Sequence, residues 1–373
     1  MDWLQASRHV FVNIKLLKIA SELKGSYCEM KALRKLSAGP KNVGVVEVPE
    51  PAPGSGQVLI KIKRAGVCGT DLHILHGHFP KVRPPVTLGH EFAGVVVEVG
   101  YGVEGWELGD KVAVETEAFS CGRCQYCRSG LTNLCPERMA YGYSVDGGFA
   151  SLVAVRHTAL HRLPAHATFQ EGALCEPLAV AVHAVLERAT VKANELVLVT
   201  GPGPIGLLVL QVAKAAGARV IITGTEKDEL RLETAALMAA DHVVRVDKNK
   251  LFDLVMEMTD GLGVDIAFEC SGATAAMNDC LVCVGRRGQI VQVGLSGRLV
   301  ETDMDQLALK EITLRGAFAH NHETWNKAID LLLKTKVDLK SLVSGEFALN
   351  DWRQAFSLFE EGKGLKYLIY PID

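Results

Sequence analysis

Two hydrophobic patterns divide the chain, and the first is typical of short β-strands. Apolar side chains occupy every second position over 57–63, and a longer apolar run covers 92–99. Glycine-rich and proline-rich turns precede or follow these runs, and a Gly-Asp turn introduces another apolar segment at 111. Alternation with period two indicates strands with one buried face. The region up to about Pro177 is therefore predicted to be an all-β unit of barrel type.

The second pattern begins near Leu178 and alternates short apolar runs with helical sequence. Apolar runs at 195–200, 219–223, 264–269 and 289–293 have the length and composition of buried strands. Between the first runs, 205–216 and 226–240 have helical sequence, and Gly217 closes the first of these helices. Strands that alternate with helices predict a parallel sheet with helices on both of its faces.

Two amphipathic helices are predicted after Phe318. Apolar residues recur at spacing i, i+3, i+4, i+7 from Trp325 and again from Trp352. Asn350 is the predicted N-cap of the second helix, and Gly362 is its predicted stop. This tail is too short for a domain of its own, so we expect it to return to the β unit.

The first 29 residues precede the fold, which we expect to begin at Met30. The apolar run at 10–20 is interrupted by Lys15 and Lys18, which does not suit a signal peptide. The basic residues would suit an organelle presequence, but Glu22 and Glu29 count against that interpretation. We expect residues 1–29 to be a poorly ordered N-terminal extension.

Composition excludes several classes of protein. The chain has 373 residues, 48% of them hydrophobic, and 40 Lys+Arg against 43 Asp+Glu give a formal charge of −3. This balance excludes a disordered chain and a basic nucleic-acid-binding surface. No run of 18 uncharged apolar residues is present, so no transmembrane helix is expected. We therefore expect a small-molecule partner, and neither nucleic acid nor a membrane.

Ten cysteines are the unusual feature of the composition, and four of them fall within fifteen residues. Four thiolates can complete a closed tetrahedral zinc shell, and such a site is structural because no coordination position stays open. Two disulfides are the alternative, although nothing in the sequence suggests secretion. The predicted structural zinc ligands are Cys121, Cys124, Cys127 and Cys135.

A second group of possible metal ligands is spread over three segments. The first segment holds a thiol, a hydroxyl and an imidazole, the second an imidazole and a carboxylate, and the third a carboxylate before Pro177. Each signal is weak alone, because a lone cysteine or histidine is more often a structural residue. These candidates are Cys68, Thr70 and His73, then His90 and Glu91, and finally Glu176.

A glycine-rich turn between the first predicted strand and helix of the parallel sheet indicates a dinucleotide site. Gly201, Gly203 and Gly206 form G-x-G-x-x-G with Pro204 and Ile205 between the last two glycines. In this context the helix N-terminus binds a pyrophosphate, whereas a merely tight turn is the alternative.

The end of the second strand of the sheet bears on the choice of coenzyme. An acid that binds the ribose 2′-hydroxyl of NAD is expected there, but the chain has Gly224, Thr225, Glu226 and Lys227. Loss of the acid removes repulsion of a 2′-phosphate, and Thr225 and Lys227 offer donors, so the sequence favours NADP. Glu226 or Asp228 could still take the acid's role, and Lys227 could be a solvated loop charge.

Together, the four-cysteine segment, the second ligand group and the dinucleotide motif resemble the zinc-containing medium-chain dehydrogenases, in particular the sorbitol (polyol) dehydrogenase branch. The resemblance runs from about Met30 to the C-terminus. It implies a fold of class α/β, with a GroES-like β-barrel catalytic domain over 30–177 and 318–373. It also implies a Rossmann domain, a doubly wound parallel sheet, over 178–317.

The resemblance also implies roles for the second ligand group. Cys68, His90 and Glu91 look like ligands of a catalytic zinc, and Glu176 looks like the fourth ligand or the group that holds the zinc-bound water. Thr70 and His73 look like a route by which the hydroxyl proton reaches solvent, although a surface or capping role for His73 is the alternative. The expected cofactors are two Zn²⁺ per subunit, one catalytic and one structural, together with NAD(P).

The expected function is a reversible hydride transfer between NAD(P) and a secondary alcohol of a polyol-like substrate. Relatives of the sorbitol branch carry Phe-Arg-Tyr where this chain has Phe318, Ala319 and His320, which puts sorbitol itself in doubt. Another sugar alcohol, a vicinal diol, a sugar acid and L-threonine stay open as substrates. A non-catalytic NADPH-binding or zinc-binding sensor is the alternative of another class. We expect a cytoplasmic homodimer or homotetramer.

Overall fold

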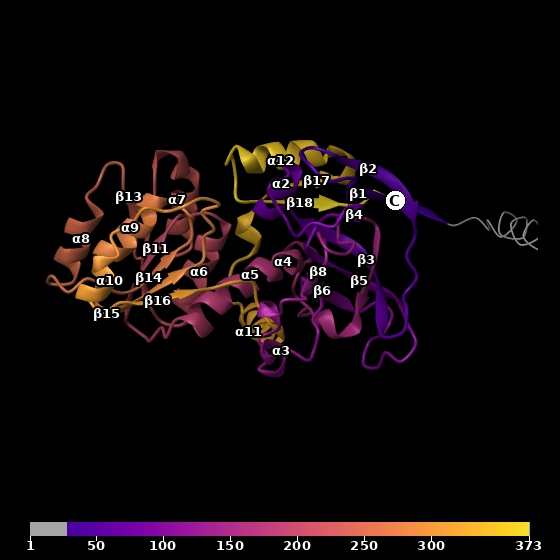
Figure 1. Cartoon of the computed structure of the whole chain (residues 1–373), viewed down its shortest axis with the longest axis horizontal. Coiled ribbons are helices and arrows are strands. Elements are labelled where there is room, and N and C mark those ends of the chain that lie inside the picture. Colours follow the sequence, from indigo (N-terminus) through magenta and orange to yellow (C-terminus); the bar gives the residue numbers. More distant parts are fainter. Residues whose placement is uncertain (1–27, 373) are drawn as a thin grey trace, which may run out of the picture.

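The computed structural model describes residues 28–372, and within them the chain forms two lobes joined by helices (Figure 1). The predicted extension 1–29 lies outside the described residues except for its last two. Strand β1 (Glu29–Lys35) begins one residue before the predicted start of the fold. Within the described part of the chain, no helix is long and apolar enough to cross a membrane.

The first lobe is built from mostly antiparallel strands, as the alternating pattern predicts. One sheet has the order β2-β1-β4, and the larger sheet has the order β10-β6-β5-β3-β18-β17, with β9 paired to β3. Apart from β1, the strands of this lobe are β2 (Val43–Pro49), β3 (Gln57–Gly66), β4 (Val86–Thr87), β5 (Glu91–Val99), β6 (Lys111–Val114), β9 (Leu152–Arg156), β10 (Leu160–Arg162), β17 (Val343–Ala348) and β18 (Lys366–Tyr370).

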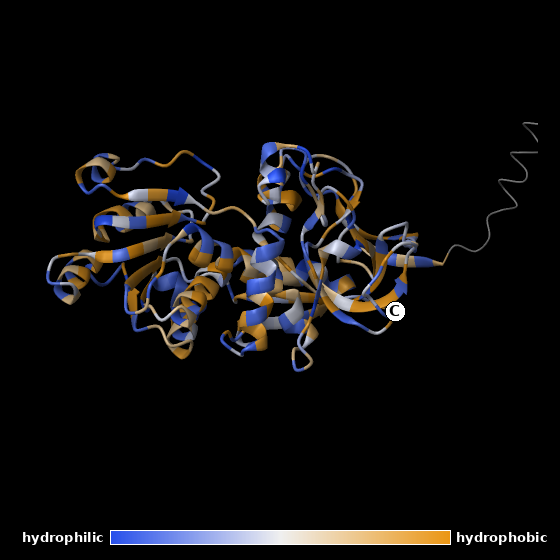
Figure 2. Ribbon diagram, turned by 90° about the horizontal axis from the view of Figure 1, so that it is seen from below, coloured by the Kyte–Doolittle hydropathy of each residue, from blue (hydrophilic) through white to orange (hydrophobic). Residues whose placement is uncertain are grey.

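The second lobe contains a six-stranded sheet in the order β13-β12-β11-β14-β15-β16, and every pairing in it is parallel. Its strands are β11 (Leu196–Thr200), β12 (Arg219–Gly224), β13 (His242–Arg245), β14 (Val264–Glu269), β15 (Val284–Gln292) and β16 (Thr313–Gly316). The helices around it are α6 (Pro204–Ala215), α7 (Glu229–Leu237), α8 (Leu251–Met258), α9 (Thr274–Cys283) and α10 (Asp305–Leu309). This topology confirms the predicted doubly wound sheet, and its helices carry both hydrophobic and hydrophilic residues (Figure 2).

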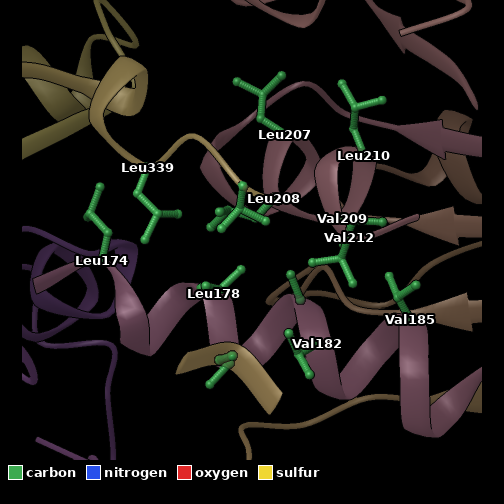
Figure 3. Packing of buried hydrophobic residues seen from close by; sticks show 14 of the residues in the cluster. Leu174, Leu178, Val182, Val185, Leu207, Leu208, Val209, Leu210, Val212 and Leu339 are labelled. Carbon is green, nitrogen blue, oxygen red and sulfur yellow. The ribbon is translucent and has the colours of Figure 1, made fainter. Parts of the chain in front are cut away.

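One hydrophobic cluster spans the two lobes, and each lobe also has a cluster of its own. Helix α5 (Cys175–Val182) packs against α6, and Leu178 and Val182 lie close to Leu208 and Val212 (Figure 3). All four side chains are at most 1% exposed. Helix α11 (His322–Leu333) also packs on α5. Burial of this kind contributes about 1.5–3 kcal/mol per large apolar side chain, which fixes the lobes relative to one another.

The C-terminal segment returns to the first lobe, as expected from its length (Figure 1). Strand β18 pairs with β3, and α12 (Trp352–Glu360) packs on β17 and β18. The prediction of Asn350 as the N-cap is wrong: Leu349–Asp351 form a 3-10 turn, and Asp351 is the N-cap. The predicted stop is consistent with the structure, since Gly362 has a left-handed φ of 68° just after the helix.

Candidate functional site

A cleft of about 450 Å³ brings together the predicted metal ligands and the dinucleotide motif. Cys68, His90, Glu91 and Glu176 line it from the first lobe and α5. Pro204 and Ile205, at the start of α6, line the same cleft, as do residues that follow β15. A coenzyme bound at the N-terminus of α6 would therefore meet the metal donors directly.

Cys68, His90 and Glu91 form a compact donor cluster. Their thiol, imidazole and carboxylate ligand atoms all lie within 4.8 Å of one another. Cys68 is the N-cap of α2 (Gly69–Leu75), whereas His90 and Glu91 stand where the chain enters β5. A thiolate, an imidazole and a carboxylate with a neighbouring open cleft make a donor set that suits Zn²⁺ with one free position.

Asp71, which the sequence analysis missed, lies behind this cluster. Its carboxylate is fully buried and accepts a hydrogen bond from the Cys68 N–H at 3.0 Å. Its Oδ1 lies 3.8 Å from Nδ1 of His90, and both atoms are buried with no hydrogen-bond partner among the described residues. Metal-ligating histidines usually have a carboxylate on the nitrogen that does not bind metal. Asp71 therefore leaves Nε2 of His90 as the nitrogen available to a metal.

Glu91 has a second partner far along the chain. Nζ of Lys366, on β18, lies 2.5 and 2.6 Å from the two carboxylate oxygens of Glu91, and both side chains are buried. Gly66 stands opposite Glu91 in the β3–β5 register, and a Cβ there would lie 2.3 Å from its Oε2. The fold thus makes room for the Glu91 carboxylate and neutralises it with a buried cation.

Glu176, in the first turn of α5, is held by two hydrogen bonds to its Oε1. Thr116 Oγ1 donates at 2.9 Å, and His320 Nε2 lies at 3.1 Å. The indole N–H of Trp325 donates to His320 Nδ1 at 2.8 Å, so Nε2 of His320 must carry the proton given to Glu176. Burial raises the pKa of Glu176, whereas the hydrogen bonds from His320 and Thr116 lower it, and the net direction is downward. His320 therefore does not merely replace an arginine: it holds Glu176 in its ionised form.

The two residues of the predicted proton route are placed differently. Thr70 lines the cleft, and its hydroxyl lies 3.9 Å from the Cys68 sulfur. His73 lies on the same short helix but is exposed and does not line the cleft. Among the described residues its side chain has no hydrogen-bond partner, so the relay role of His73 stays a prediction.

The four remaining predicted ligands, Cys121, Cys124, Cys127 and Cys135, lie together around helix α3 (Gln125–Arg128). We call this small segment the four-cysteine lobe, to distinguish it from the two large lobes of the molecule. All four thiols are free, and their sulfurs lie within 4.8 Å of one another, with 3.9 Å between Cys121 and Cys127. Zinc–sulfur bonds of about 2.3 Å in a tetrahedron place sulfurs about 3.8 Å apart, so the arrangement fits zinc and not disulfides. Backbone N–H groups donate to three of the sulfurs at 3.4 Å, and such bonds lower the pKa of Cys121 to about 6.

A third cluster, Glu115, His161 and His322, was also missed. Glu115 Oε1 lies 2.6 Å from His161 Nε2 and 2.5 Å from His322 Nδ1. These distances are those of charge-assisted hydrogen bonds and are shorter than the spacing of ligands around a metal. The His161 ring also stacks on Trp325 at 5.0 Å. The cluster therefore fastens the N-terminus of α11, which carries Trp325, to β6 and β10.

The pKa shifts in this third cluster predict a pH-dependent contribution to stability. Burial raises the pKa of Glu115, but bonds to His161 and His322 lower it to about 2, and Glu115 raises the pKa of His322. The lowered pKa of Glu115 stabilises the folded state above about pH 4.5. The raised pKa of His322 stabilises it further below about pH 6.5. Glu115→Gln should therefore cost at most about 3 kcal/mol, with the largest effect between these values and a smaller one at pH 9.

Thermal unfolding of the wild type and of Glu115→Gln at pH 5.5, 7 and 9 measures this difference. Glu323→Gln is the matched control, because Glu323 is an exposed residue of the same helix whose pair with Lys327 contributes little. A Glu115→Gln effect that is equal at pH 5.5 and pH 9 would contradict the ion-pair account.

The glycines of the dinucleotide motif have three different surroundings. Gly201 has a φ of 92°, which only glycine adopts easily, and a Cβ on Gly206 would lie 1.9 Å from the Gly201 carbonyl oxygen. A Cβ on Gly203, the N-cap of α6, would meet no protein atom within 4 Å. The fold itself does not require glycine at 203, so a ligand that approaches the backbone there is the remaining reason for it.

The surroundings of Gly224, at the end of β12, are consistent with the absence of an acidic residue at that position. A Cβ on Gly224 would lie 2.9 Å from the Pro202 ring, so a larger residue would need local adjustment. Asp228 is occupied, since it accepts hydrogen bonds from the N–H and hydroxyl of Thr225 at 3.0 Å. Glu226 lies 3.9 Å from Arg245, which is the last residue of the neighbouring strand β13 and is also paired with Glu229 and Asp247. Of the open alternatives, Asp228 is therefore not free to bind a ribose.

Comparison with known proteins agrees with this arrangement. Family models match residues 54–165 as an alcohol dehydrogenase GroES-like domain and residues 204–334 as a zinc-binding dehydrogenase. A sorbitol dehydrogenase of Halalkalibacterium halodurans is 43% identical over 92% of this chain and 100% of its own length. A D-arabitol-phosphate dehydrogenase of Enterococcus avium is 38% identical over 91% of this chain and 97% of its own. A zinc-binding dehydrogenase of Sinorhizobium meliloti bound to NADP superposes with a TM-score of 0.85, at 32% identity over 92% and 100% of the two chains.

Proposed function

Because the chain belongs to the zinc-containing medium-chain alcohol and polyol dehydrogenases, we propose that the cleft interconverts a secondary alcohol of a polyol-like substrate and its ketone. The chain is an oxidoreductase that uses zinc and NAD(P). The observation that carries the proposal is the single cleft shared by the donor cluster and the N-terminus of α6. A non-catalytic role has no support, since the relatives are dehydrogenases and Cys68, Thr70, His90 and Glu91 are all present.

We assign the catalytic zinc to Cys68, His90 and Glu91, and the structural zinc to the four-cysteine lobe. When bound, the catalytic zinc supplies a Lewis acid that acidifies the substrate hydroxyl. Asp71 orients the imidazole of His90. Lys366 offsets the negative charge that Glu91 adds to the metal site. His320 holds the Glu176 carboxylate in place at the edge of that site. Glu176 then serves as a fourth ligand or as an acceptor for water beside the metal.

The remaining steps concern the proton and the hydride. Thr70 Oγ1 accepts the hydroxyl proton from the substrate and passes its own proton toward His73, which releases it to solvent. Gly203 and the N-terminus of α6 would hold the pyrophosphate of the coenzyme, which, when bound, would supply the acceptor for the hydride from the hydroxyl-bearing carbon. The products are a ketone, the reduced coenzyme and one proton, and the reverse reaction uses the same groups.

We propose NADP as the preferred coenzyme. Gly224 presents no carboxylate, Asp228 is held by Thr225, and Lys227 is exposed beside them. Lys227→Gln is expected to raise the KM for NADP by about 5–10-fold, because a charge-assisted hydrogen bond at an exposed site contributes about 1–1.5 kcal/mol. The KM for NAD should stay within about twofold.

Initial rates with both coenzymes measure this preference. Lys250→Gln is the control, since Lys250 is an exposed cation of a nearby loop outside the dinucleotide motif. A wild type that prefers NAD, or a Lys227→Gln variant that changes both KM values equally, would overturn the proposed preference.

Substrate class is tested by initial rates on polyols, vicinal diols, sugar acids and L-threonine, each with NAD and with NADP. The proposal expects turnover of secondary alcohols flanked by further hydroxyls. Turnover of none of these compounds with either coenzyme would reject it. L-Threonine alone as substrate would favour a threonine 3-dehydrogenase activity instead.

We further propose a cytoplasmic homo-oligomer, a dimer or tetramer. Strand β16 is an edge of the parallel sheet, and Leu299, Met304, Leu309 and Leu314, on or near it, are 42–99% exposed. Apolar residues at a strand edge favour pairing with a second copy. Sedimentation equilibrium should give a mass of two or four chains, and a monomer at micromolar concentration would reject this proposal.

A further inference from the structure

Two cations line the cleft without an acidic partner, and from them we infer that the substrate carries an anionic group, a phosphate ester or a carboxylate, at the end remote from the reacting hydroxyl. The cations are Lys81 and Arg138. The inference rests on the proposed function and deepens it, because it selects among the substrates left open above. The shared chemistry is an oxyanion bound by an arginine and a lysine.

Arg138 has unused hydrogen-bonding capacity. Its Nη1 donates to the Tyr143 hydroxyl at 2.9 Å, whereas its Nε is buried and has no hydrogen-bond partner among the described residues. Nor does any described carboxylate form an ion pair with it. A guanidinium offers five N–H donors in a planar fork, and leaving a buried donor without an acceptor costs about 1–3 kcal/mol. The Nε is shielded from the cleft, but Nη2 also has no hydrogen-bond partner among the described residues and is not buried, so Nη2 is the donor that an oxyanion in the cleft could reach.

Lys81 supplies the second positive charge. Its side chain is exposed, and Nζ lies 5.4 Å from the centroid of the Phe318 ring, which also lines the cleft. Within residues 28–372 Lys81 forms no ion pair. The part of the cleft that carries Lys81 and Arg138 is therefore positively charged, and no described carboxylate pairs with either residue.

The other ionised groups of the cleft do not cancel this charge. Glu91 is paired with Lys366 at 2.5 Å, and the ionised Glu176 is held by Thr116 and His320 and forms no ion pair with Lys81 or Arg138. A neutral polyol would leave two cations beside its hydroxyl groups with no counter-charge. A phosphate or carboxylate supplies that charge, and its interaction with the partly buried Arg138 is stronger than it would be in water.

The spacing of the site favours an anion some carbons away from the reacting centre. The Tyr143 ring stands between the donor cluster and Arg138: its centroid lies 6.1 Å from that of His90, and its hydroxyl accepts from Arg138. The substrate must therefore span a tyrosine ring between its reacting hydroxyl and its anion. L-Threonine places its carboxylate two bonds from the hydroxyl-bearing carbon, which is too close, whereas a polyol phosphate or a sugar acid has the required length.

Matched substrates test the inference. Each C5 and C6 polyol of the panel is compared with its terminal phosphate ester and with its terminal acid, and the ratio of kcat/KM for the anionic to the neutral compound is measured. We expect a ratio of at least about 100 for the phosphate or the acid, and whichever of the two is higher identifies the anion. The KM of the anionic compound should rise between 20 and 200 mM NaCl, as expected for charge pairing.

Variants then locate the effect. Arg138→Gln and Lys81→Gln should each reduce the ratio by about 10-fold, and the double variant should reduce it more. Arg83→Gln is the matched control, because Arg83 lies on the same loop as Lys81, contacts Met139 and does not line the cleft. The ratio of this control should match the wild type. Lys81 is exposed, so its variant folds even if Arg138→Gln does not.

The outcomes separate the two proposals. Turnover of neutral polyols with a ratio near one, or a ratio that Lys81→Gln and Arg138→Gln leave unchanged, overturns the anionic substrate and leaves the dehydrogenase activity standing. Failure to turn over any alcohol with either coenzyme overturns the proposed function itself.

Discussion

A Cys68→Ser variant is expected to fold and to bind coenzyme normally while kcat falls by at least about a thousandfold, a loss of about 4 kcal/mol in transition-state stabilisation. The reason is local: Cys68 supplies the only thiol of the donor cluster with His90 and Glu91. A serine hydroxyl is a poor zinc ligand compared with a thiolate, so the metal should be lost from this site. The four-cysteine lobe is a separate cluster and should keep its own ion.

Three measurements define this result: kcat, zinc content by atomic emission, and the affinity for reduced coenzyme by fluorescence. Zinc should fall from two ions per chain to one, with coenzyme affinity within about threefold of the wild type. Cys28→Ser is the control, since Cys28 is exposed and belongs to neither cluster. A Cys68→Ser variant that retains both its second zinc and its turnover would disprove the assignment.

Cys135→Ser should have the second largest effect, and it should fall on stability. The lobe it belongs to has few buried apolar side chains, and the four thiols are its most concentrated interaction. Structural zinc commonly contributes about 10 kcal/mol or more to the folding of such a segment. We expect loss of one zinc, a thermal midpoint lower by several degrees, and loss of hydrogen-exchange protection confined to the lobe.

Catalysis should also weaken in Cys135→Ser, although to a smaller extent than in Cys68→Ser. Asn133 is buried in the lobe, and its side-chain amide donates to the Phe318 carbonyl oxygen at 2.8 Å. Since Phe318 lines the cleft, disorder in the lobe disturbs the cleft wall. Unchanged protection over residues 121–135 would show that the lobe does not depend on a metal.

The fold was predictable from the hydrophobic pattern for elements that have one or both faces buried. Strand β14 has the predicted bounds because its apolar run has no alternative to a central position in the sheet. The helix predicted from Glu226 starts later, at Glu229, because Asp228 caps a 3-10 turn with Thr225. The strands β13 and β16 were missed, since both lie at sheet edges and carry exposed or polar residues.

The site was predictable only as far as its parts are close in sequence. Spacing indicated the four cysteines of the structural site, which fall within fifteen residues, whereas Cys68, His90 and Glu91 were weak candidates that only the family resemblance joined. The pairings of Glu91 with Lys366 and of Glu176 with His320 join residues 275 and 144 positions apart, and no local pattern encodes them. The one available signal was Lys366 itself, a charged residue at the start of an otherwise apolar strand.

The central claim is that zinc held by Cys68, His90 and Glu91 is required for hydride transfer. The most direct test is the initial rate of NAD(P) reduction by chelator-stripped protein whose fold is verified by circular dichroism, before and after zinc is restored. We predict a rate below about 1% of the native value after stripping, which corresponds to about 2.7 kcal/mol or more, and recovery on addition of zinc. Equal rates in the stripped and restored protein would contradict the zinc-dependent mechanism.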